Sequence, residues 1–455
     1  MTKQHIHLIA IGGSAMHNLA LELKALGHEV TGSDDQIFEP SRSRLNAQGL
    51  LPKTMGWSAS RIHSGLDVVI LGMHAKPDNP ELLAAQTLGL TIQSYPEFIY
   101  STCQNKTRVV IGGSHGKTTT TSMILHCIEQ CSGLQNVDYM VGAQLKNFDR
   151  MVSLSSEAQL IVIEGDEYLS SPIDRRSKFL WYKPQIAVLT GIAWDHINVF
   201  PTFDSYLETF KAFVLSIEPG GVLFYNQDDV VLSDLVNSIE HDIQKVAYTT
   251  AKHHIKNGQT FLEFQHQALA IKFFGAHNLM NFQAANLVLQ ALGYQEEKIV
   301  KSIQNFEGAD KRLSLIHQSE HRLVYRDFAH SPSKVKACVE AVKTQFKDAD
   351  LHVVLELHTY SSLSKSFLPN YKSCFDGIPS PILFYSPKAL EIKQMEALDA
   401  DYIRQAFQCD DLAIYSQKED LEQALKHRKS NQTKPSVFLF MSSGQFAGLD
   451  LLSFN

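Results

Sequence analysis

Residues 108–128 read RVVIGGSHGKTTTTSMILHCI, a sequence that indicates the fold class. An apolar run typical of a buried strand leads into a glycine-rich loop, which is followed by Lys-Thr and a helical pattern. Glycines let backbone N–H groups close around phosphate oxygens, and the N-terminus of a helix adds a favourable dipole. The stretch therefore predicts a phosphate-binding loop in an α/β domain, although Ile111 stands where the general pattern has glycine.

The loop carries residues with separate expected tasks. Lys117 is expected to reach the β- and γ-phosphates of ATP, and Thr118 to hold Mg²⁺. The alternative is a glycine-rich turn with a chance lysine, which the strand before it and the helix after it disfavour. The residues predicted to bind ATP here are Gly113, Ser114, His115, Gly116, Lys117, Thr118 and Thr119.

Acidic and histidine side chains follow the next two apolar runs. Glu164 ends the run 160–163, and a carboxylate at a strand end beside a phosphate loop can supply a second magnesium ligand. Asp166 and Glu167 crowd the same turn, so repulsion is expected unless a cation is present; a solvated acidic turn is the alternative. His196 follows the run 185–192, but Mg²⁺ prefers oxygen, and the residues alone favour a hydrogen-bonded loop histidine there.

Length and element alternation give the domain organisation. At roughly 150 residues per domain, 455 residues predict about three domains. Strand-like and helical segments alternate in the first hundred residues and again after Gly308, which favours parallel sheets with helices on both faces. We therefore predict an α/β protein of three domains. They are a Rossmann-like domain over 1–105, a P-loop ATPase-like central domain over 106–308 and a Rossmann-like C-terminal domain over 309–455.

Two further loops lie at strand ends. Gly12-Gly13-Ser14 turns from the first strand into a helix, and Asp34 follows Gly12 by 22 positions, a spacing that suits a nucleotide whose ribose is read by an acid. A plain packing turn is equally compatible, since Ala10 breaks the glycine pattern. The segment 325–332, YRDFAHSP, suits either a ligand site or a structural helix cap.

Composition excludes several functional classes. The chain has 41 Lys+Arg and 48 Asp+Glu, a net charge of −7, whereas a nucleic-acid binder is expected to be basic. It contains no apolar run of the roughly 20 residues that span a bilayer, and its N-terminus lacks signal-peptide features. Six scattered cysteines do not form a disulfide framework. We expect a cytoplasmic protein with neither membrane nor nucleic-acid partners, as a monomer or weak dimer.

The motifs taken together resemble the Mur ligases, the ATP-dependent amide-forming enzymes of peptidoglycan assembly. GGSHGKTTT, VIEGDE, AWDHINVF, GAHNLMN, Lys311-Arg312 and DFAHSP occur in the family's order, and the resemblance covers nearly the whole chain. Residues 7–34 resemble the UDP-binding domain of the members that act directly on UDP-N-acetylmuramate. The resemblance implies that the UDP-sugar is bound by Gly12, Gly13, Ser14, Asp34, His74 and Asn79. An NAD-dependent oxidoreductase would leave the phosphate loop and Glu164 without a role.

The family implies roles for the remaining candidates. ATP phosphorylates the substrate carboxylate to an acyl phosphate, an amine attacks, and phosphate leaves. The implied metal ligands are Thr118, Glu164 and His196, and the implied catalytic residues are Lys117, Glu164, His196 and His330, with His330 facing the amine. Adenine is expected against His277, Asn278 and Asn281, the phosphates near Arg312 and the ribose near Asp327.

The acceptor is where the chain departs from its relatives. Residues 166–179, DEYLSSPIDRRSKF, resemble the member that attaches the tripeptide L-alanyl-γ-D-glutamyl-meso-diaminopimelate and carry Arg175, Arg176 and Lys178. His358 stands where that member has arginine, and the arginine pair of the L-alanine-adding member is missing. Arg326 and Ser331 also depart from the family pattern. We expect the tripeptide as acceptor, with L-alanine as the alternative. Lys211 is compatible with a carbamylated, metal-bridging lysine or with an exposed helical one.

Overall fold

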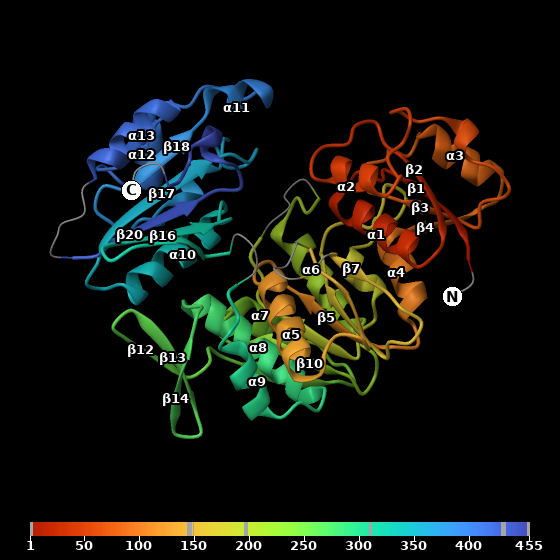
Figure 1. Cartoon of the computed structure of the whole chain (residues 1–455), viewed down its shortest axis with the longest axis horizontal. Helices are drawn as coiled ribbons and strands as arrows, with labels where there is room; N and C mark the ends of the chain where they lie inside the picture. Colours follow the sequence, from red (N-terminus) through yellow and green to blue (C-terminus); the bar gives the residue numbers. More distant parts are fainter. Residues whose placement is uncertain are drawn as a thin grey trace. The chain divides into compact units, whose positions relative to one another are not determined.

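The computed structural model describes residues 3–142, 148, 150–194, 199–308, 312–428 and 434–452. The chain forms two compact units, one of Met1–Thr249 with Asn281–Ser302 and one of Thr250–Met280 with Ile303–Asn455 (Figure 1). Three of the four sheets are mainly parallel, so the predicted α/β class is confirmed. The predicted boundaries at residues 106 and 308 stay predictions.

The first sheet of the first unit is four-stranded and parallel, in the order β2-β1-β3-β4. Its central strands bury their apolar side chains on both faces, as expected for a parallel sheet between helices. The strands are β1 His5–Ile9, β2 Glu29–Ser33, β3 Val68–Leu71 and β4 Thr91–Ser94, and the helices are α1 Ser14–Ala25, α2 Ser41–Ala47, α3 Pro80–Thr87 and α4 Tyr95–Cys103.

A fully buried carboxylate ties this sheet together. Glu81, at the start of α3, accepts hydrogen bonds from Ser33 and from Arg61 Nη1 at 2.9 Å, and lies 3.3 Å from His7 Nε2. Burial alone would raise the pKa of Glu81, but its hydrogen bonds to His7, Ser33 and the Ser58 backbone outweigh burial and lower the pKa. The ionised carboxylate is therefore the form that the fold stabilises.

We expect Glu81→Gln to lower the free energy of unfolding by about 2 kcal/mol at pH 7, because it removes one charge from a buried, hydrogen-bonded set. Since the folded pKa lies below the unfolded value, the ionised form stabilises the fold above the unfolded pKa near 4.5. That stabilisation is lost as the pH falls through the folded pKa. Urea unfolding at pH 7 and pH 4 should show the difference between the two proteins shrinking with acid; a constant difference would contradict the assignment.

The second sheet of this unit has seven strands in the order β11-β10-β9-β5-β8-β6-β7, of which only β7 runs antiparallel to its neighbour. The strands are β5 Thr107–Gly112, β6 Val137–Met140, β7 Val152–Ser153, β8 Leu160–Glu164, β9 Ile186–Leu189, β10 Val222–Asn226 and β11 Gln244–Tyr248. The helices are α5 Lys117–Ser132, α6 Phe203–Leu215, α7 Val230–Ser238 and α9 Glu296–Ile303; α8 Ala276–Ala291 belongs to both units. Strand β5 lies between β8 and β9, with Ile111 beside Glu164 and Gly112 beside Leu189. The carboxyl ends of the three strands therefore meet at one edge, where ligands of such sheets bind.

A buried acid joins the two sheets of the first unit. Glu22, on α1, accepts a hydrogen bond from the Leu154 backbone N–H at 2.9 Å and pairs with Arg150. Its side chain is buried, so the pair holds α1 against the segment around β7.

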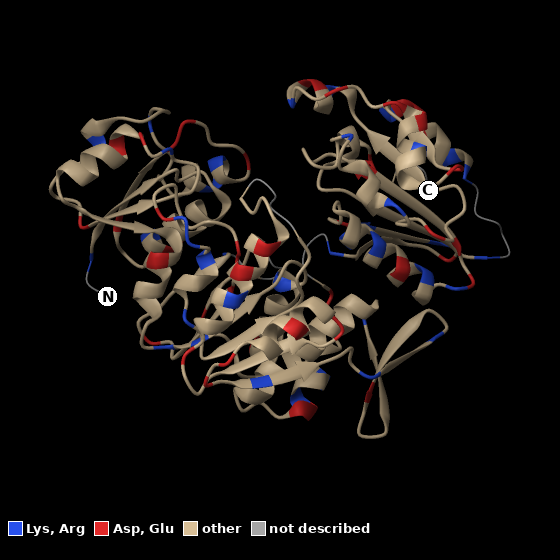
Figure 2. Cartoon of the chain, turned by 180° about the vertical axis from the view of Figure 1, so that it is seen from behind, with Lys and Arg blue, Asp and Glu red and all other residues tan. Residues whose placement is uncertain are grey.

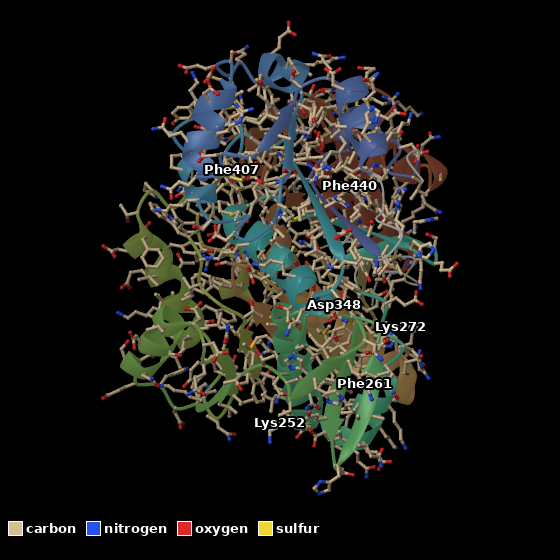
Figure 3. The ribbon with its side chains drawn as sticks, turned by 90° about the vertical axis from the view of Figure 1, so that its left-hand side faces the viewer. Lys252, Phe261, Lys272, Asp348, Phe407 and Phe440 are labelled. Atoms are coloured by element: carbon tan, nitrogen blue, oxygen red, sulfur yellow. The ribbon has the colours of Figure 1, made fainter. Side chains whose placement is uncertain are left out.

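The second unit contains a three-stranded antiparallel sheet and a six-stranded sheet in the order β15-β16-β20-β17-β18-β19. In the larger sheet only β15 is antiparallel to its neighbour. Figure 3 shows Phe261 on the small sheet and Phe440 within the larger one. The strands are β12 His253–Lys256, β13 Gln259–Phe264, β14 Gln267–Ile271, β15 Ser314–Gln318, β16 Arg322–Asp327, β17 Asp350–Leu357, β18 Ile382–Tyr385, β19 Ala413–Tyr415 and β20 Ser436–Met441. The helices are α10 Pro332–Gln345, α11 Pro387–Ile392, α12 Ala400–Phe407 and α13 Lys418–His427.

Charges of both signs are interspersed over the two units (Figure 2). Within the part of the chain that the structure describes, no helix combines the length and the apolar character needed to cross a bilayer.

Candidate active site

The phosphate loop lies between β5 and α5, and neighbouring segments define its shape. Gly113 and Gly116 have φ values of +124° and +85°, which favour glycine. A Cβ atom at Gly113 would lie 2.1 Å from Thr190 Oγ1, and one at Gly116 would lie 2.3 Å from Asn281 Oδ1. The loop is therefore enclosed by the segment after β9 and by α8, which places Asn281 next to Gly116.

Lys117 is a cation at the first turn of α5, and 14% of its side chain is exposed. Its ammonium donates to the Gly113 carbonyl and to Glu167 Oε2, the latter at 2.7 Å. Burial alone would lower the pKa of Lys117, but the carboxylates of Glu167 and Asp166 outweigh burial and raise it. A fixed positive charge thus adds to the helix N-terminus.

The acidic turn after β8 is neutralised by lysines. Glu167 pairs with Lys117, and Asp166 pairs with Lys178. Burial opposes ionisation of Asp166, yet the ammonium groups of Lys178 and Lys117 lower its pKa to about 2. The expected repulsion is therefore relieved by two cations of the protein itself.

Glu164 and Thr118, both predicted to bind Mg²⁺, are in direct contact. Thr118 Oγ1 donates to Glu164 Oε1 at 2.8 Å, and the Gly142 N–H donates to Glu164 Oε2 at 2.7 Å. Burial raises the pKa of Glu164. A hydroxyl and a carboxylate are the hard oxygen donors that Mg²⁺ prefers, so this pair fits the ion. His196 lies outside the described residues, and those that are described contain no group of three or more His, Cys, Asp or Glu side chains suited to a metal.

Other loop residues make internal hydrogen bonds. Ser114 donates its N–H to Gly191 O at 3.0 Å, and its hydroxyl lies 2.8 Å from Tyr206 OH. His115 Nδ1 lies 2.8 Å from the Ser114 carbonyl oxygen. Thr119 is buried in α5. Thr190 and Tyr206 carry no sequence signal, because their contacts depend on strands and helices that are distant in the chain.

The edge of the first sheet brings together most of the predicted UDP-sugar residues. Gly12 N–H donates to Asp34 Oδ2 at 2.7 Å, and the exposed His74 lies near Gly13, where a Cβ atom would lie 3.7 Å from His74 Cδ2. Burial is the main cause of a raised pKa for Asp34. Its carboxylate braces the loop.

Asn79 has a structural use. Its Oδ1 caps α3 by accepting from the N–H groups of Glu81 and Leu82 at 2.9 and 3.2 Å. Its side chain is buried.

The second unit gathers the remaining nucleotide candidates. His277 is partly buried, and the loss of hydration lowers its pKa; the charge of Asp327 opposes that shift and the charge of Arg312 adds to it. Asp327 accepts from the backbone N–H groups of Leu313 and Ala329 at 2.6 and 2.5 Å. Asn278 donates to Phe274 O at 3.0 Å. His277 therefore lies close enough to Asp327 and Arg312 for both charges to act on it.

His330, the histidine predicted to face the amine, lies just after strand β16. His330 Nδ1 lies 2.8 Å from Phe328 O, and Tyr371 OH donates to the His330 carbonyl. The guanidinium of Arg312 lies 5.5 Å from the Phe328 ring centre. Glu356, which is close to His358 in the sequence, is buried. Its carboxylate accepts hydrogen bonds from the Ser442 hydroxyl and from the Phe446 N–H.

Of the three basic side chains in residues 175–178, two form ion pairs within the protein, so they are not three free cations as expected. Arg176 pairs with Asp174 at 2.9 Å and lies 4.0 Å from the Trp181 ring centre, while Lys178 pairs with Asp166. Arg175 is exposed and has no ion-pair partner among the described residues.

Lys211 lies on α6, is half-exposed, and pairs with Glu208 at 3.7 Å. This is the arrangement of a surface helical lysine.

Comparisons with known proteins agree with this geometry. The profile "Mur ligase family, catalytic domain" matches residues 5–107, and "Mur ligase middle domain" matches residues 111–289. The UDP-N-acetylmuramate–L-alanine ligase of Aquifex aeolicus is 31% identical over 366 residues, covering 78% of each protein. A UDP-N-acetylmuramate:L-alanyl-gamma-D-glutamyl-meso-diaminopimelate ligase structure from Neisseria meningitides is 26% identical, with a TM-score of 0.60, and covers 67% of this chain and 98% of that one. A UDP-N-acetylmuramate–alanine ligase structure from Thermotoga maritima, 18% identical with a TM-score of 0.70 and coverage of 98% and 97%, shares the fold.

Proposed function

The chain belongs to the Mur ligase family, whose members are ATP-dependent ligases, and we propose that it joins the carboxylate of UDP-N-acetylmuramate to the amine of L-alanyl-γ-D-glutamyl-meso-diaminopimelate. The observation that carries the ligase assignment is the grouping of Lys117, Thr118 and Glu164 at the head of α5. We place the UDP-sugar at Gly12, Gly13, Ser14 and His74.

The proposed chemistry needs charge neutralisation and alignment more than covalent participation by the protein. The γ-phosphoryl group of ATP passes to the carboxylate, giving an acyl phosphate and ADP. The acceptor amine attacks the acyl carbon, and the tetrahedral intermediate expels inorganic phosphate. Lys117 stabilises the negative charge on the transferring phosphoryl group, and His330 faces the amine.

A magnesium ion would be held by Thr118 and Glu164, together with His196. When bound, it would neutralise phosphate charge. The adenosine part of ATP is assigned to His277, Asn278, Asn281, Arg312 and Asp327. The division into domains over 1–105, 106–308 and 309–455 is part of the same proposal.

Charge supports the tripeptide as acceptor. Arg175 is exposed in the segment that resembles the tripeptide-adding member, and a peptide with several carboxylates is complementary to such a cation. A single buried carboxylate without a cationic partner is costly, and the strand end around His358 lacks the arginine pair that would hold free L-alanine. L-alanine remains the second candidate, because the Aquifex aeolicus relative is named as a UDP-N-acetylmuramate–L-alanine ligase.

Competition kinetics test the acceptor. With UDP-N-acetylmuramate, ATP and each acceptor in turn, we expect phosphate release with a kcat/KM for the tripeptide at least about tenfold above that for L-alanine, as expected for one or more charge-assisted contacts. Arg175→Ala should reduce this preference, while Arg176→Ala, whose side chain is paired with Asp174, should reduce it less. A kcat/KM for L-alanine equal to or above that for the tripeptide would replace the first candidate with the second.

A further inference from the structure

A chain of buried hydrogen bonds connects the phosphate loop to α6. Tyr206 OH lies 2.8 Å from Ser114 Oγ and donates to Glu167 Oε1 at 3.1 Å. The Ala193 N–H donates to Ser114 Oγ at 2.8 Å, and Lys117 Nζ donates to Glu167 Oε2 at 2.7 Å. This chain of hydrogen bonds therefore joins four parts of the sequence: the phosphate loop with Lys117, Glu167, Ala193 and Tyr206.

The chemistry of the groups fixes the direction of this chain. A carboxylate only accepts hydrogen bonds, so the single phenolic proton of Tyr206 goes to Glu167. The Tyr206 oxygen must then accept the proton of Ser114. The Ser114 oxygen in turn accepts from the Ala193 N–H. The hydroxyl of Ser114 is thereby committed within the protein, and Tyr206 is the link between the loop and the carboxylate that holds Lys117.

The surroundings make the link rigid. Tyr206 is 0% exposed, Glu167 1% and Ser114 7%. The Tyr206 ring is held edge-on by Phe200 and Phe210, with ring centres 5.1 and 5.0 Å away. In such surroundings a lost partner leaves a buried polar group unsatisfied, while the ring packing does not depend on the hydroxyl.

We propose that Tyr206 is a positioning residue for nucleotide binding: through Glu167 and Ser114 it fixes the Lys117 ammonium and the loop backbone in the arrangement that receives the phosphates. This inference rests on the proposed ATP site. Without the hydroxyl, Ser114 loses its acceptor and Glu167 loses a donor, so the lysine and the loop each gain alternative arrangements.

The test is Tyr206→Phe in the full chain. We expect the KM for ATP, and the Kd for ATP measured by calorimetry, to rise about tenfold, as expected from the loss of one or two buried hydrogen bonds. The KM for UDP-N-acetylmuramate should stay within about twofold, because that substrate is assigned to the first sheet. The melting temperature reports any general loss of stability.

Tyr182→Phe is the matched control. Tyr182 is equally buried in the same unit, and among the described residues its hydroxyl donates a hydrogen bond only to the Met140 sulfur, at 3.8 Å. It should lower stability no more than Tyr206→Phe does, because it loses only a weak contact to sulfur, and it should leave the KM for ATP unchanged. Equal effects of both variants on ATP would show a structural role and overturn the proposal.

A double-mutant cycle gives a second readout. Ser114→Ala and Tyr206→Phe break the same hydrogen bond. The Kd for ATP of the double variant should therefore be about equal to that of the single variant with the higher Kd. Multiplying effects would overturn the link. A wild-type chain that fails to bind ATP would refute the proposed function, whereas wild-type affinity in Tyr206→Phe would refute only the role of Tyr206.

Discussion

Replacing Lys117 with alanine is expected to lower kcat by about 10³-fold, because the variant loses a fixed cation where charge is transferred between two anions. The ammonium lies at the start of α5 with a raised pKa and is therefore charged. The Kd for UDP-N-acetylmuramate should change by less than about threefold, because the loop proposed to bind it follows a strand of the other sheet. Phosphate release and calorimetry measure the two quantities.

Two further variants separate catalysis from folding. Lys117→Ala removes the ammonium group that pairs with the buried Glu167, which is destabilising. The double variant Lys117→Ala/Glu167→Gln also removes the carboxylate charge and should recover part of the melting temperature without recovering turnover. Lys298→Ala removes an exposed charge from α9 and should have wild-type kinetics. Wild-type turnover in Lys117→Ala would refute the phosphate-loop assignment.

The central strands were the most predictable part of the fold. Runs such as 160–164 and 436–441 are apolar at nearly every position, since both faces of a central parallel strand are covered. The edge strands β7 and β19 have two and three residues, too few to show a period. Strand β15 is largely exposed and alternates little. Edge strands depend on pairing with a neighbour, which a local pattern does not encode.

The candidate site likewise has features that the sequence predicts and features that depend on the three-dimensional structure. The contact between Thr118 and Glu164 follows from local motifs, because the carboxyl ends of adjacent parallel strands must meet at one edge. The bracing role of Asp34 and the cap made by Asn79 could not be separated from ligand binding by sequence, since both uses need the same polar side chain at a strand or helix end. The pairing of Arg176 with Asp174 and the position of Tyr206 require three-dimensional neighbours.

Glu164→Gln is expected to lower kcat by about 10²- to 10³-fold and to raise the magnesium concentration needed for half-maximal activity at least about tenfold. The amide keeps the size of the side chain but removes the negative charge that makes it a ligand for a hard cation. It also places an N–H₂ group toward either Thr118 or Gly142, both of which donate to the carboxylate. Magnesium titrations of phosphate release at saturating ATP measure both effects.

Position and charge can be tested separately at this carboxylate. A Cβ atom at Gly142 would lie 2.5 Å from Glu164 Oε1, so Gly142→Ala should displace the carboxylate without removing its charge and give an intermediate loss of activity. Glu157→Gln neutralises an exposed carboxylate shortly before β8 and should leave the magnesium requirement unchanged. If Glu164→Gln keeps the wild-type magnesium requirement while Gly142→Ala loses activity, the carboxylate shapes the loop and the ion is bound elsewhere. The opposite pattern, a large shift for Glu164→Gln and a smaller one for Gly142→Ala, is the result that a magnesium ligand at the end of β8 requires.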